Sequence, residues 1–362
     1  MAMYEVYYRD PYGNLLEVFR QFERLEYARK ENEIGVMNLR LPRSVPKSIL
    51  RPDARMEIWR TVGAVTKLVG NTTWFLEDWE ISSKYMELTA YDANWIIDGA
   101  IVDYNAGSTD ASCAAEAADD AMKRILRHNL STGTTTTVLV GLSPYLTIDA
   151  DVTLAPTTTK DFSRRNCLKL LQELAQESRE QGTYLSFDIE YVDAGQLTFK
   201  TYTNQRGFDH GRASGSPVIL SERSKSLEDV SYIEKHGSEK TYVIAGGQGT
   251  EDTRMVERAQ DDTRYYRSPF GMRKLWLDAR MCSTSDSLLA EANAELEANQ
   301  PEIKLTGRVV DTDGLRFGIH YDFGDIVVAE FEDISIDAHV DTIRVTVQDG
   351  FEQIDNRITG YL

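Results

Sequence analysis

The sequence predicts a mainly β protein interrupted by an α+β insertion, and three patterns support this fold class. Short stretches of alternating apolar and polar residues follow one another through the first hundred positions. Apolar residues at helical spacing appear in a central region and once more near residue 290. A hairpin pattern occupies residues 317–354. Period-two alternation is typical of half-buried strands, whereas spacings of three and four are typical of helices.

Composition limits the classes of function. At 362 residues the chain is long enough for two or three domains, and 41% hydrophobic content is ordinary for a globular protein. The formal net charge of −18 argues against a sequence-independent grip on nucleic acid and against docking to an anionic membrane. The three cysteines lie far apart and indicate no disulfide framework. We expect no secretory signal and no membrane span, because no apolar run approaches the ~20 residues that a membrane helix needs.

Residues 1–100 are predicted to form a first β domain, either a sandwich or a barrel. Tyr4, Val6 and Tyr8 recur at every second position, and residues 10–14 have the composition of a turn. Six or seven short strands are expected. They include residues 4–9, 15–22, 35–41, 56–61, 74–79 and 85–91.

Residues 101–215 are predicted to form an α+β domain. The alanine-rich residues 111–130 are helical by propensity. A second helix is expected over residues 161–181, because Leu168, Leu171 and Leu174 share one face. A hairpin over residues 184–202 follows, with a turn at 193–195. Two loops complete this domain in the prediction, the threonine run 134–137, which is a loop or an extended strand, and the glycine-rich residues 204–216.

Residues 216–362 are predicted to form a second β-barrel domain with a flanking helix. Strands over 230–235 and 240–245 are expected to pair through a turn at 236–238. A helix over 285–299 is expected to begin at Ser285 as its N-cap, with Leu288 opening its apolar face. A strand over 303–310 leads into the last hairpin.

The last hairpin pairs two predicted strands, 325–331 and 342–348. Gly324 precedes the first strand and is able to adopt positive φ, and Asp349-Gly350 is a turn dipeptide. Because an isolated hairpin is marginally stable, this one needs a sheet or barrel around it.

No residue is expected to be catalytic or to bind a cofactor or a metal. Gly246-Gly247-Gln248-Gly249 follows a strand but lacks the Lys-Ser/Thr ending of a phosphate loop, which favours a turn. Asp311-Thr312-Asp313-Gly314 resembles the start of a calcium loop without its distal Glu, which again favours a turn. The histidines show no metal-binding spacing. They are His128, His210, His236, His320 and His339.

Two groups of charged residues were weighed for catalysis. One is Asp209-His210 with Arg206 and Arg212, which lies in a glycine-rich loop, so a loop role is favoured. The other is the acids that alternate along two strands, which would suit a glycosidase but are interpreted as the solvated faces of those strands. These acids are Asp188, Glu190 and Asp193, and Glu77, Asp78 and Glu80.

Three stretches carry a resemblance to a known family. They are DPYGNLLEVFRQFERLEYARKENEIGVMNLRLP with the following MEIWR, then AGGQGTEDTR, and finally YDFGDIVVAEFEDISIDAHVDTIRVTVQDGFEQI. Together they resemble the tail hub, or tail-associated baseplate protein, of long-tailed bacteriophages, which is related in fold to the hub of contractile-phage baseplates. The resemblance implies two tube-like β barrels with a helix-bearing domain. It also implies a homotrimer, in which six barrels form a pseudo-sixfold ring that meets the sixfold tail tube.

The function that follows from this resemblance is structural. We expect a trimeric hub in the virion, made in the host cytoplasm, that closes the tail tube and contacts the distal tail protein, the tape-measure protein and fibre or tip proteins. DNA would pass through its lumen without specific binding, as the acidic charge favours. Two alternatives stay open at this point. One is an enzyme that degrades the cell envelope, a glycosidase or peptidase, and the other is a carbohydrate-binding β protein.

Overall fold

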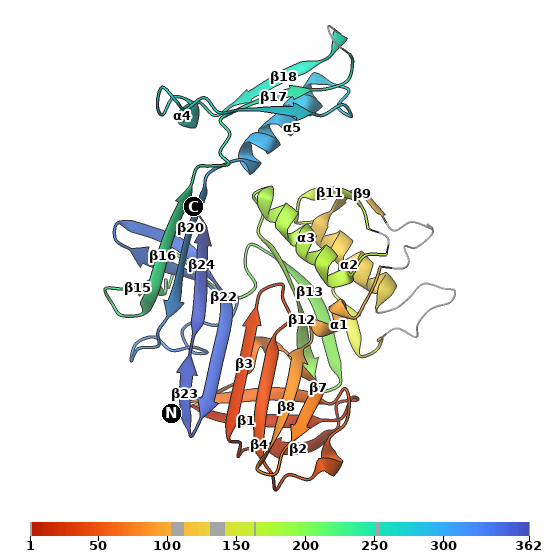
Figure 1. Cartoon of the computed structure of the whole chain (residues 1–362), viewed down its shortest axis with the longest axis vertical. Coiled ribbons are helices and arrows are strands. Elements are labelled where there is room, and N and C mark those ends of the chain that lie inside the picture. The colour runs from red at the N-terminus through yellow and green to blue at the C-terminus, as the bar shows by residue number, and fades with distance from the viewer. Residues whose placement is uncertain (1, 103–111, 131–141, 163, 251–252, 362) are drawn as a thin grey trace. The chain divides into compact units, whose positions relative to one another are not determined.

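The computed structural model describes residues 2–102, 112–130, 142–162, 164–250 and 253–361 (Figure 1). The threonine run 134–137 lies outside these residues. The chain divides into two compact units. Unit 1 comprises Met1–Ser178, Tyr184–Ser231 and Leu305–Gly360, and unit 2 comprises Arg179–Thr183, Tyr232–Lys304 and Tyr361–Leu362. The domains proposed from the sequence, 1–100, 101–215 and 216–362, stay a prediction beside this division.

The mainly β class is confirmed, and the largest sheet contains 16 strands. Its main path runs β16-β20-β24-β22-β3-β4-β8-β7-β5-β1-β2. Strands β16 and β2 end this path, so strand pairing among the described residues does not close a barrel. The strands of this sheet are β1 (Met3–Arg9), β2 (Leu15–Phe19), β3 (Arg24–Lys30), β4 (Val36–Pro42), β5 (Arg55–Val62), β6 (Val65–Leu68), β7 (Trp74–Ile81), β8 (Tyr85–Asp92), β14 (Asp209–His210), β15 (Ile219–Ser221), β16 (Leu227–Lys235), β20 (Glu302–Val309), β21 (Ile326–Phe331), β22 (Ile334–Gln348), β23 (Phe351–Ile354) and β24 (Asn356–Tyr361).

Strand β22 joins the last strands of the chain to the first ones. Its residues 342–348 pair antiparallel with β3, so that Val345 lies opposite Tyr27. Both side chains are fully buried, as the alternation of each strand requires. The N-terminal and C-terminal strands therefore share one continuous sheet, although most of the chain separates them in sequence (Figure 1).

The last hairpin differs from its prediction in register. Strand β22 begins at Ile334, earlier than residue 342, and its first half, 334–339, is the part that pairs with β21. The turn at Asp349-Gly350 is confirmed. It joins β22 to β23, so it lies outside the hairpin of β21 and β22. Both turn residues have positive φ, 52° and 78°, as the tightest hairpin turns require.

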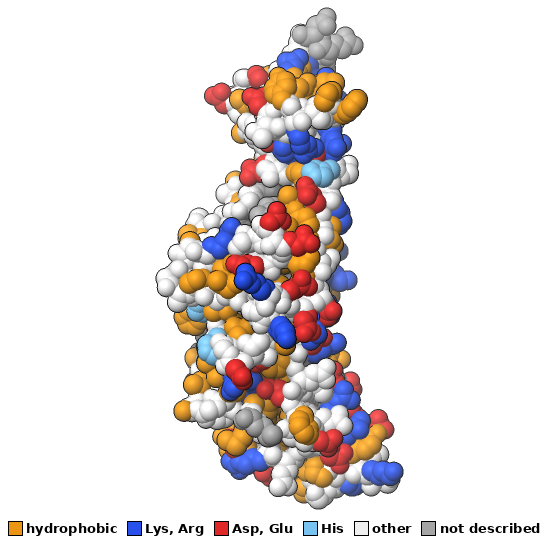
Figure 2. All heavy atoms as spheres, turned by 90° about the vertical axis from the view of Figure 1, so that its left-hand side faces the viewer, with side chains coloured by type: hydrophobic (Ala, Val, Ile, Leu, Met, Phe, Trp, Pro, Cys, Tyr) orange, Lys and Arg blue, Asp and Glu red, His pale blue; other side chains and the backbone are white. Residues whose placement is uncertain are grey.

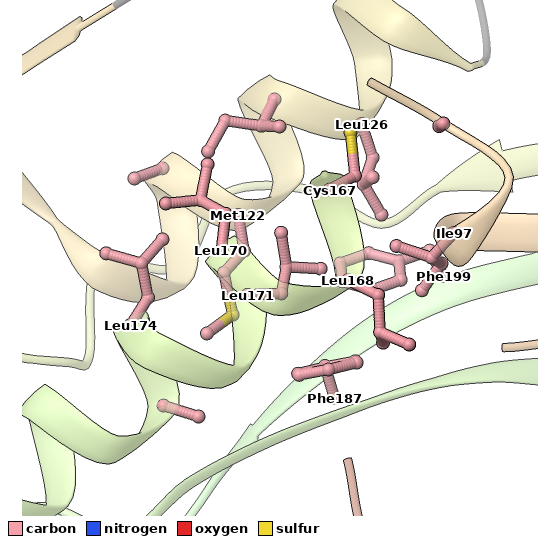
Figure 3. Close-up of a cluster of buried hydrophobic side chains, with 14 of the residues drawn as sticks. Ile97, Met122, Leu126, Cys167, Leu168, Leu170, Leu171, Leu174, Phe187 and Phe199 are labelled. Atoms are coloured by element: carbon pink, nitrogen blue, oxygen red, sulfur yellow. The ribbon is translucent and has the colours of Figure 1, made fainter. Parts of the chain in front are cut away.

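The predicted α+β insertion packs two helices against a hairpin within unit 1. The hairpin of β12 (Leu185–Asp193) and β13 (Gln196–Thr203) is confirmed, and β10 (Leu146–Ile148) extends it. Leucines of α3 (Cys167–Glu180) lie between the hairpin and α2 (Ala118–Asn129), as Figure 3 shows. Leu168 faces Phe187 and Phe199 there, whereas Leu170 faces Met122. A short helix, α1 (Trp95–Asp98), adds Ile97 to the same core.

Both predicted helices of the insertion begin later than expected. Residues 112–117 form strand β9 (Ser112–Ala117), which pairs with β11 (Thr157–Asp161). Ala117 is extended, with φ −60° and ψ 133°, and the helix begins only at Ala118. Here a strand partner outweighs the helical propensity of alanine. The same pairing takes residues 157–161 into β11, so α3 begins at Cys167 instead of residue 161.

Unit 2 is a three-stranded sheet with one helix on it. Strand β17 (Tyr242–Gly246) lies between β18 (Val256–Gln260) and β19 (Lys274–Asp278). Helix α5 (Ser285–Ala298) packs Leu288, Ala292 and Leu296 onto Val243 and Ala245 of β17. A short helix, α4 (Asp262–Tyr265), follows β18. No described helix of the chain is long and apolar enough to cross a membrane.

The predicted pairing of 230–235 with 240–245 is wrong. Strand β16 pairs with β20, whereas β17 pairs with β18 and β19. Residues 236–241 form no tight turn. Glu239 is buried there and pairs with Arg267 and Arg273, each 2.9 Å away. The predicted cap at Ser285 is also wrong, since Thr284 is the N-cap of α5 and its hydroxyl accepts the Ser287 N–H at 3.2 Å.

Candidate functional site

A buried cluster of charges lies at the centre of unit 1, and it begins with Arg29. Alternation along β3 places Arg29 on the same face as Leu25 and Tyr27, so its side chain is buried. A buried cation is stable only with well-placed anions. Arg29 Nε donates to Asp92 Oδ2 at 2.8 Å, and Nη2 donates to Asp188 Oδ1 at 2.7 Å. Asp92 ends β8 of the sheet, whereas Asp188 belongs to β12 of the insertion.

Arg206 completes the cluster from the segment that follows the hairpin. Its guanidinium lies 2.6 Å from Asp188 Oδ2 and 3.3 Å from Glu190 Oε1. Arg29 and Arg206 both donate to the carbonyl oxygen of Gly70, at 2.5 and 3.1 Å. They also contact the ring of Phe323, whose centroid lies 5.0 and 4.9 Å from the two guanidinium carbons. We call these residues (Arg29, Asp92, Asp188, Glu190 and Arg206) the charge cluster.

The pKa shifts of the charge cluster follow from its burial and pairing. Burial raises the pKa of Asp92, and Arg29 opposes that rise. The neighbouring carboxylates Asp188 and Asp92 outweigh burial at Arg29 and hold its pKa above the ordinary value. Asp188 and Glu190 likewise raise the pKa of Arg206. The cluster thus holds both arginines charged and joins the insertion to the sheet.

A cleft of about 770 Å³ opens beside the charge cluster. Its residues come from four stretches that are distant in sequence: 59–71, 190–192, 206–210 and 319–325. The apolar side chains of Val192, Phe208 and Ile319 line it and are exposed. Asp325 lies in its wall, and its carboxylate accepts the N–H groups of Phe208 and Asp322, each at 2.6 Å. Burial raises the pKa of Asp325 to about 6.

A second buried ion pair ties the first strands to the last. Arg60 of β5 donates to both carboxylate oxygens of Glu352 in β23, at 2.7 and 3.0 Å. It also donates to the carbonyl oxygen of Phe317 at 2.6 Å. Tyr4 of β1 donates to Glu352, and burial is the main cause that raises the pKa of Tyr4.

The structure separates most of the candidates that the sequence brought together. Arg206 is in the charge cluster, whereas Arg212 is exposed and pairs with Asp337 at 3.4 Å. Asp209 accepts the N–H of Gly211 at 2.8 Å, and His210 lines the cleft. Asp209, His210, Arg206 and Arg212 therefore form no joint site.

The acids on strands divide into two kinds. Asp188 is 1% exposed, so its interpretation as part of a solvated face is wrong. The reason is Arg29 and Arg206, which bind it from two sides. Asp193 instead lies in the hairpin turn and accepts the N–H of Gly195 at 2.7 Å. Glu77, Asp78 and Glu80 are exposed or half-buried on β7, as expected of a solvated face.

Of the two loop motifs, residues 311–314 contain a turn, as predicted, whereas Gly246 is the last residue of β17 and residues 248–249 form a bend as the chain turns away from that strand. A Cβ on Gly246 would come within 2.7 Å of both the Trp276 ring and Arg254, so the residues of unit 2 already fill the space above it. Residues 251–252 lie outside the described part of this segment. The carboxylate of Asp311 accepts a hydrogen bond from the Tyr321 hydroxyl at 2.8 Å. The backbone groups of Thr312 and Leu315 form hydrogen bonds with each other.

The histidines are dispersed over the molecule. His128 is in α2, and His339 of β22 stacks on Tyr184 at 4.2 Å between centroids. His236 of unit 2 contacts Glu234 and Glu239, and His320 Nδ1 accepts the Arg316 N–H at 2.9 Å. Across the described residues no group of three His, Cys, Asp or Glu side chains is placed to hold a metal ion.

Sequence reasoning missed strand β3 and therefore Arg29. The signal was present, because Leu25, Tyr27 and Arg29 alternate with Arg24, Glu26 and Ala28. An arginine on the apolar side of a strand indicates buried acids elsewhere, because a buried cation needs anions as partners. Arg60 and Glu352 carry no such local signal.

Solved structures share this fold over nearly the whole chain. The prophage tail protein gp18 from Listeria monocytogenes EGD-e aligns with a TM-score of 0.54 at 12% identity, covering 99% of this chain and 94% of that chain. The 43 kDa tail protein of prophage MuSo2 from Shewanella oneidensis aligns with a TM-score of 0.54 at 11% identity, covering 99% and 98%. A chain of the Francisella PdpA-VgrG complex aligns at 0.51 and 11% identity, covering 100% of this chain and 57% of that chain. No curated protein matches.

The chain therefore shares the fold class of these prophage tail proteins, and the family resemblance seen in the sequence is confirmed. Within that class, the chain belongs to the family described as Siphovirus ReqiPepy6 Gp37-like protein, whose model matches residues 4–358.

Proposed function

We propose that three copies of this chain form a tail hub that closes the tail tube at the tip of the virion. The hub joins the sixfold tube to a threefold tip and contacts the distal tail protein, the tape-measure protein and fibre or tip proteins. Its role is structural, and DNA passes through its lumen during ejection.

The observation that carries this proposal is the sheet that the two ends of the chain build together. Strand β22 pairs with β3, and the Arg60–Glu352 ion pair reinforces the same junction. Each chain thus brings an N-terminal and a C-terminal group of strands into one sheet. Three such chains supply six groups of strands, which is the number that a sixfold tube requires. The full-length match to prophage tail proteins supports the same assignment.

The charge cluster supports a structural role for two of the acids considered for catalysis, the buried Asp188 and the half-buried Glu190. Asp188 and Glu190 both bind arginines, so neither carboxylate is available as the general acid or base that a glycosidase needs. Their placement explains how the insertion stays fixed on the sheet.

Mass measurement of the purified full chain tests the proposal. Light scattering at micromolar concentration should give three times the chain mass of 41.0 kDa. Electron microscopy of assembled tails should then place this trimer at the tip. A chain that stays monomeric, and that releases fragments from peptidoglycan, would instead support the envelope-degrading enzyme, whereas glycan binding by a monomer would support the carbohydrate-binding alternative.

A further inference from the structure

Among the described residues of unit 2, the face of the sheet opposite α5 is contacted only by the short helix α4, whose Tyr265 lies 6.0 Å from Tyr242 between ring centroids. Val243, Ala245 and Ala259 point toward α5, so the residues that alternate with them lie on the opposite side. Ile244, Arg258 and Trp276 form one row across the three strands by register. Tyr242 and Lys274 form the next row. We call these five residues the open face.

The open face carries aromatic rings and the cations Arg258 and Lys274, and at its edge Asp278 pairs with Arg254. Trp276 is 51% exposed, and the Arg254 guanidinium lies over its ring at 5.1 Å. Lys274 lies over the Tyr242 ring at 5.4 Å, and Arg258 is exposed. The chain that leads from α4 to β19 adds further exposed apolar side chains, Tyr266, Phe270 and Met272. Figure 2 shows hydrophobic side chains gathered on this unit beside charged side chains of both signs. Exposed aromatics beside cations are typical of binding surfaces.

The outward side of α5 is complementary to the open face. Asp286, Ala290, Ala294 and Glu297 fall on that side at spacings of three and four, and all are exposed. Glu291 is exposed at its border. The helix contains four acidic residues and no Lys or Arg. Two alanines at the centre leave room for large side chains to approach, and carboxylates surround them. We call these five residues the helix face.

We propose that the open face of one copy binds the helix face of unit 2 in the next copy. The aromatic side chains would cover Ala290 and Ala294, while Arg258 and Lys274 would meet Glu291 and Glu297. Because the two surfaces differ, this contact is head-to-tail, and such contacts form a ring when the rotation closes. This inference rests on the proposed trimer and assigns the contact between its subunits.

Charge reversal on each side tests the contact in the full-length protein. Arg258→Glu with Lys274→Glu changes the open face, and Glu291→Lys with Glu297→Lys changes the helix face. Each pair should raise the dissociation constant of the trimer at least about tenfold, because like charges then meet. Combining all four substitutions restores opposite charges and should return the constant to within about threefold of the wild-type value. Sedimentation equilibrium over a concentration series measures all three.

A matched control is Arg43→Glu with Lys47→Glu, two exposed residues of unit 1. It makes the same change in net charge as the open-face variant and should leave assembly unchanged. Trp276→Ala is a second test, since it removes the central aromatic without changing charge and should also weaken the trimer. Circular dichroism establishes that each variant is folded.

The results separate this inference from the proposed function. A wild-type trimer that both one-sided variants and Trp276→Ala leave intact would overturn the contact and leave the hub standing. A wild-type chain that stays monomeric would overturn the hub and the contact with it. Weakening by either reversed pair, followed by recovery in the combined variant, would establish the contact.

Discussion

Arg29 is the residue on which the centre of unit 1 depends. It is 2% exposed and binds one acid from the sheet and one from the insertion. Such a residue is predictable from sequence only in part. The alternation in β3 indicates that Arg29 is buried, but nothing near it in sequence indicates that Asp92 and Asp188 are its partners. Long-range pairing of charges depends on the path of the chain, which local patterns do not contain.

Replacing Arg29 should destabilise the protein strongly. Arg29→Met keeps much of the side-chain volume but leaves Asp92 without its cation and Asp188 with Arg206 alone. We expect the free energy of unfolding to fall by about 3–5 kcal/mol, as for other broken buried pairs. Urea unfolding measures it. The control is Arg20→Met, whose pair with Glu5 lies at the surface, so its loss should leave the free energy of unfolding nearly unchanged. A similar effect of the two substitutions would contradict the role given to the charge cluster.

Asp325 should give unit 1 a pH dependence of its own. Burial raises its pKa to about 6, above the roughly 3.9 of an unfolded Asp. Between these values the folded chain holds a proton that the unfolded chain has lost, so this group lowers the free energy of unfolding as pH rises from about 4 to about 6. Asp325→Asn removes that titration. Over this interval the variant should lose less stability than the wild type, by on the order of 3 kcal/mol.

Urea unfolding at a series of pH values measures this difference. The matched control is Asp333→Asn, an exposed residue of the turn between β21 and β22, which should follow the wild-type curve. Parallel curves for Asp325→Asn and the wild type would show that the carboxyl of Asp325 titrates normally.

At the scale of elements, sequence patterns located strands and helices better than their ends and partners. The hairpin of β12 and β13 was predicted because its alternation and turn are both local. The starts of α2 and α3 were predicted wrongly. The segments before these helices form β9 and β11, which pair with each other across about forty residues. The false pairing of 230–235 with 240–245 has the same origin, because two neighbouring strand patterns were assumed to pair with each other.

Helix α5 offers a direct test of one such boundary. Thr284 accepts the Ser287 N–H, whereas the Ser285 hydroxyl donates to Glu257. Thr284→Ala should therefore cost about 1 kcal/mol of the stability of unit 2, the usual value for a lost N-cap. Ser285→Ala removes only an exposed contact and should cost less than about 0.5 kcal/mol. Hydrogen exchange of the α5 amides measures the effect of both substitutions. Equal effects would contradict the assignment of Thr284 as the N-cap.

At the scale of the whole molecule, the sequence predicted the fold class and the family but not the continuity of the sheet. Two regions of strands at the two ends of the chain suggested separate β domains. The structure joins them through β22, whose two halves pair with different strands. Strand β22 has 15 residues and pairs on both sides, whereas only its clearly alternating half, residues 342–348, was predicted as a strand.

The charge of the molecule leads to the last prediction, which concerns DNA. A net charge of −18 for each copy would be repeated in every subunit of the proposed hub. A protein grips DNA without regard to sequence by replacing counterions with clustered Lys and Arg, and binding of that kind weakens steeply with salt. The purified chain should therefore leave the fluorescence anisotropy of labelled duplex DNA unchanged at low salt. The double variant Glu291→Lys/Glu297→Lys should behave in the same way, since two reversed charges leave the chain strongly acidic. DNA binding by the wild type that disappears as salt is raised would reveal a basic lining, and would contradict a lumen through which DNA slides freely.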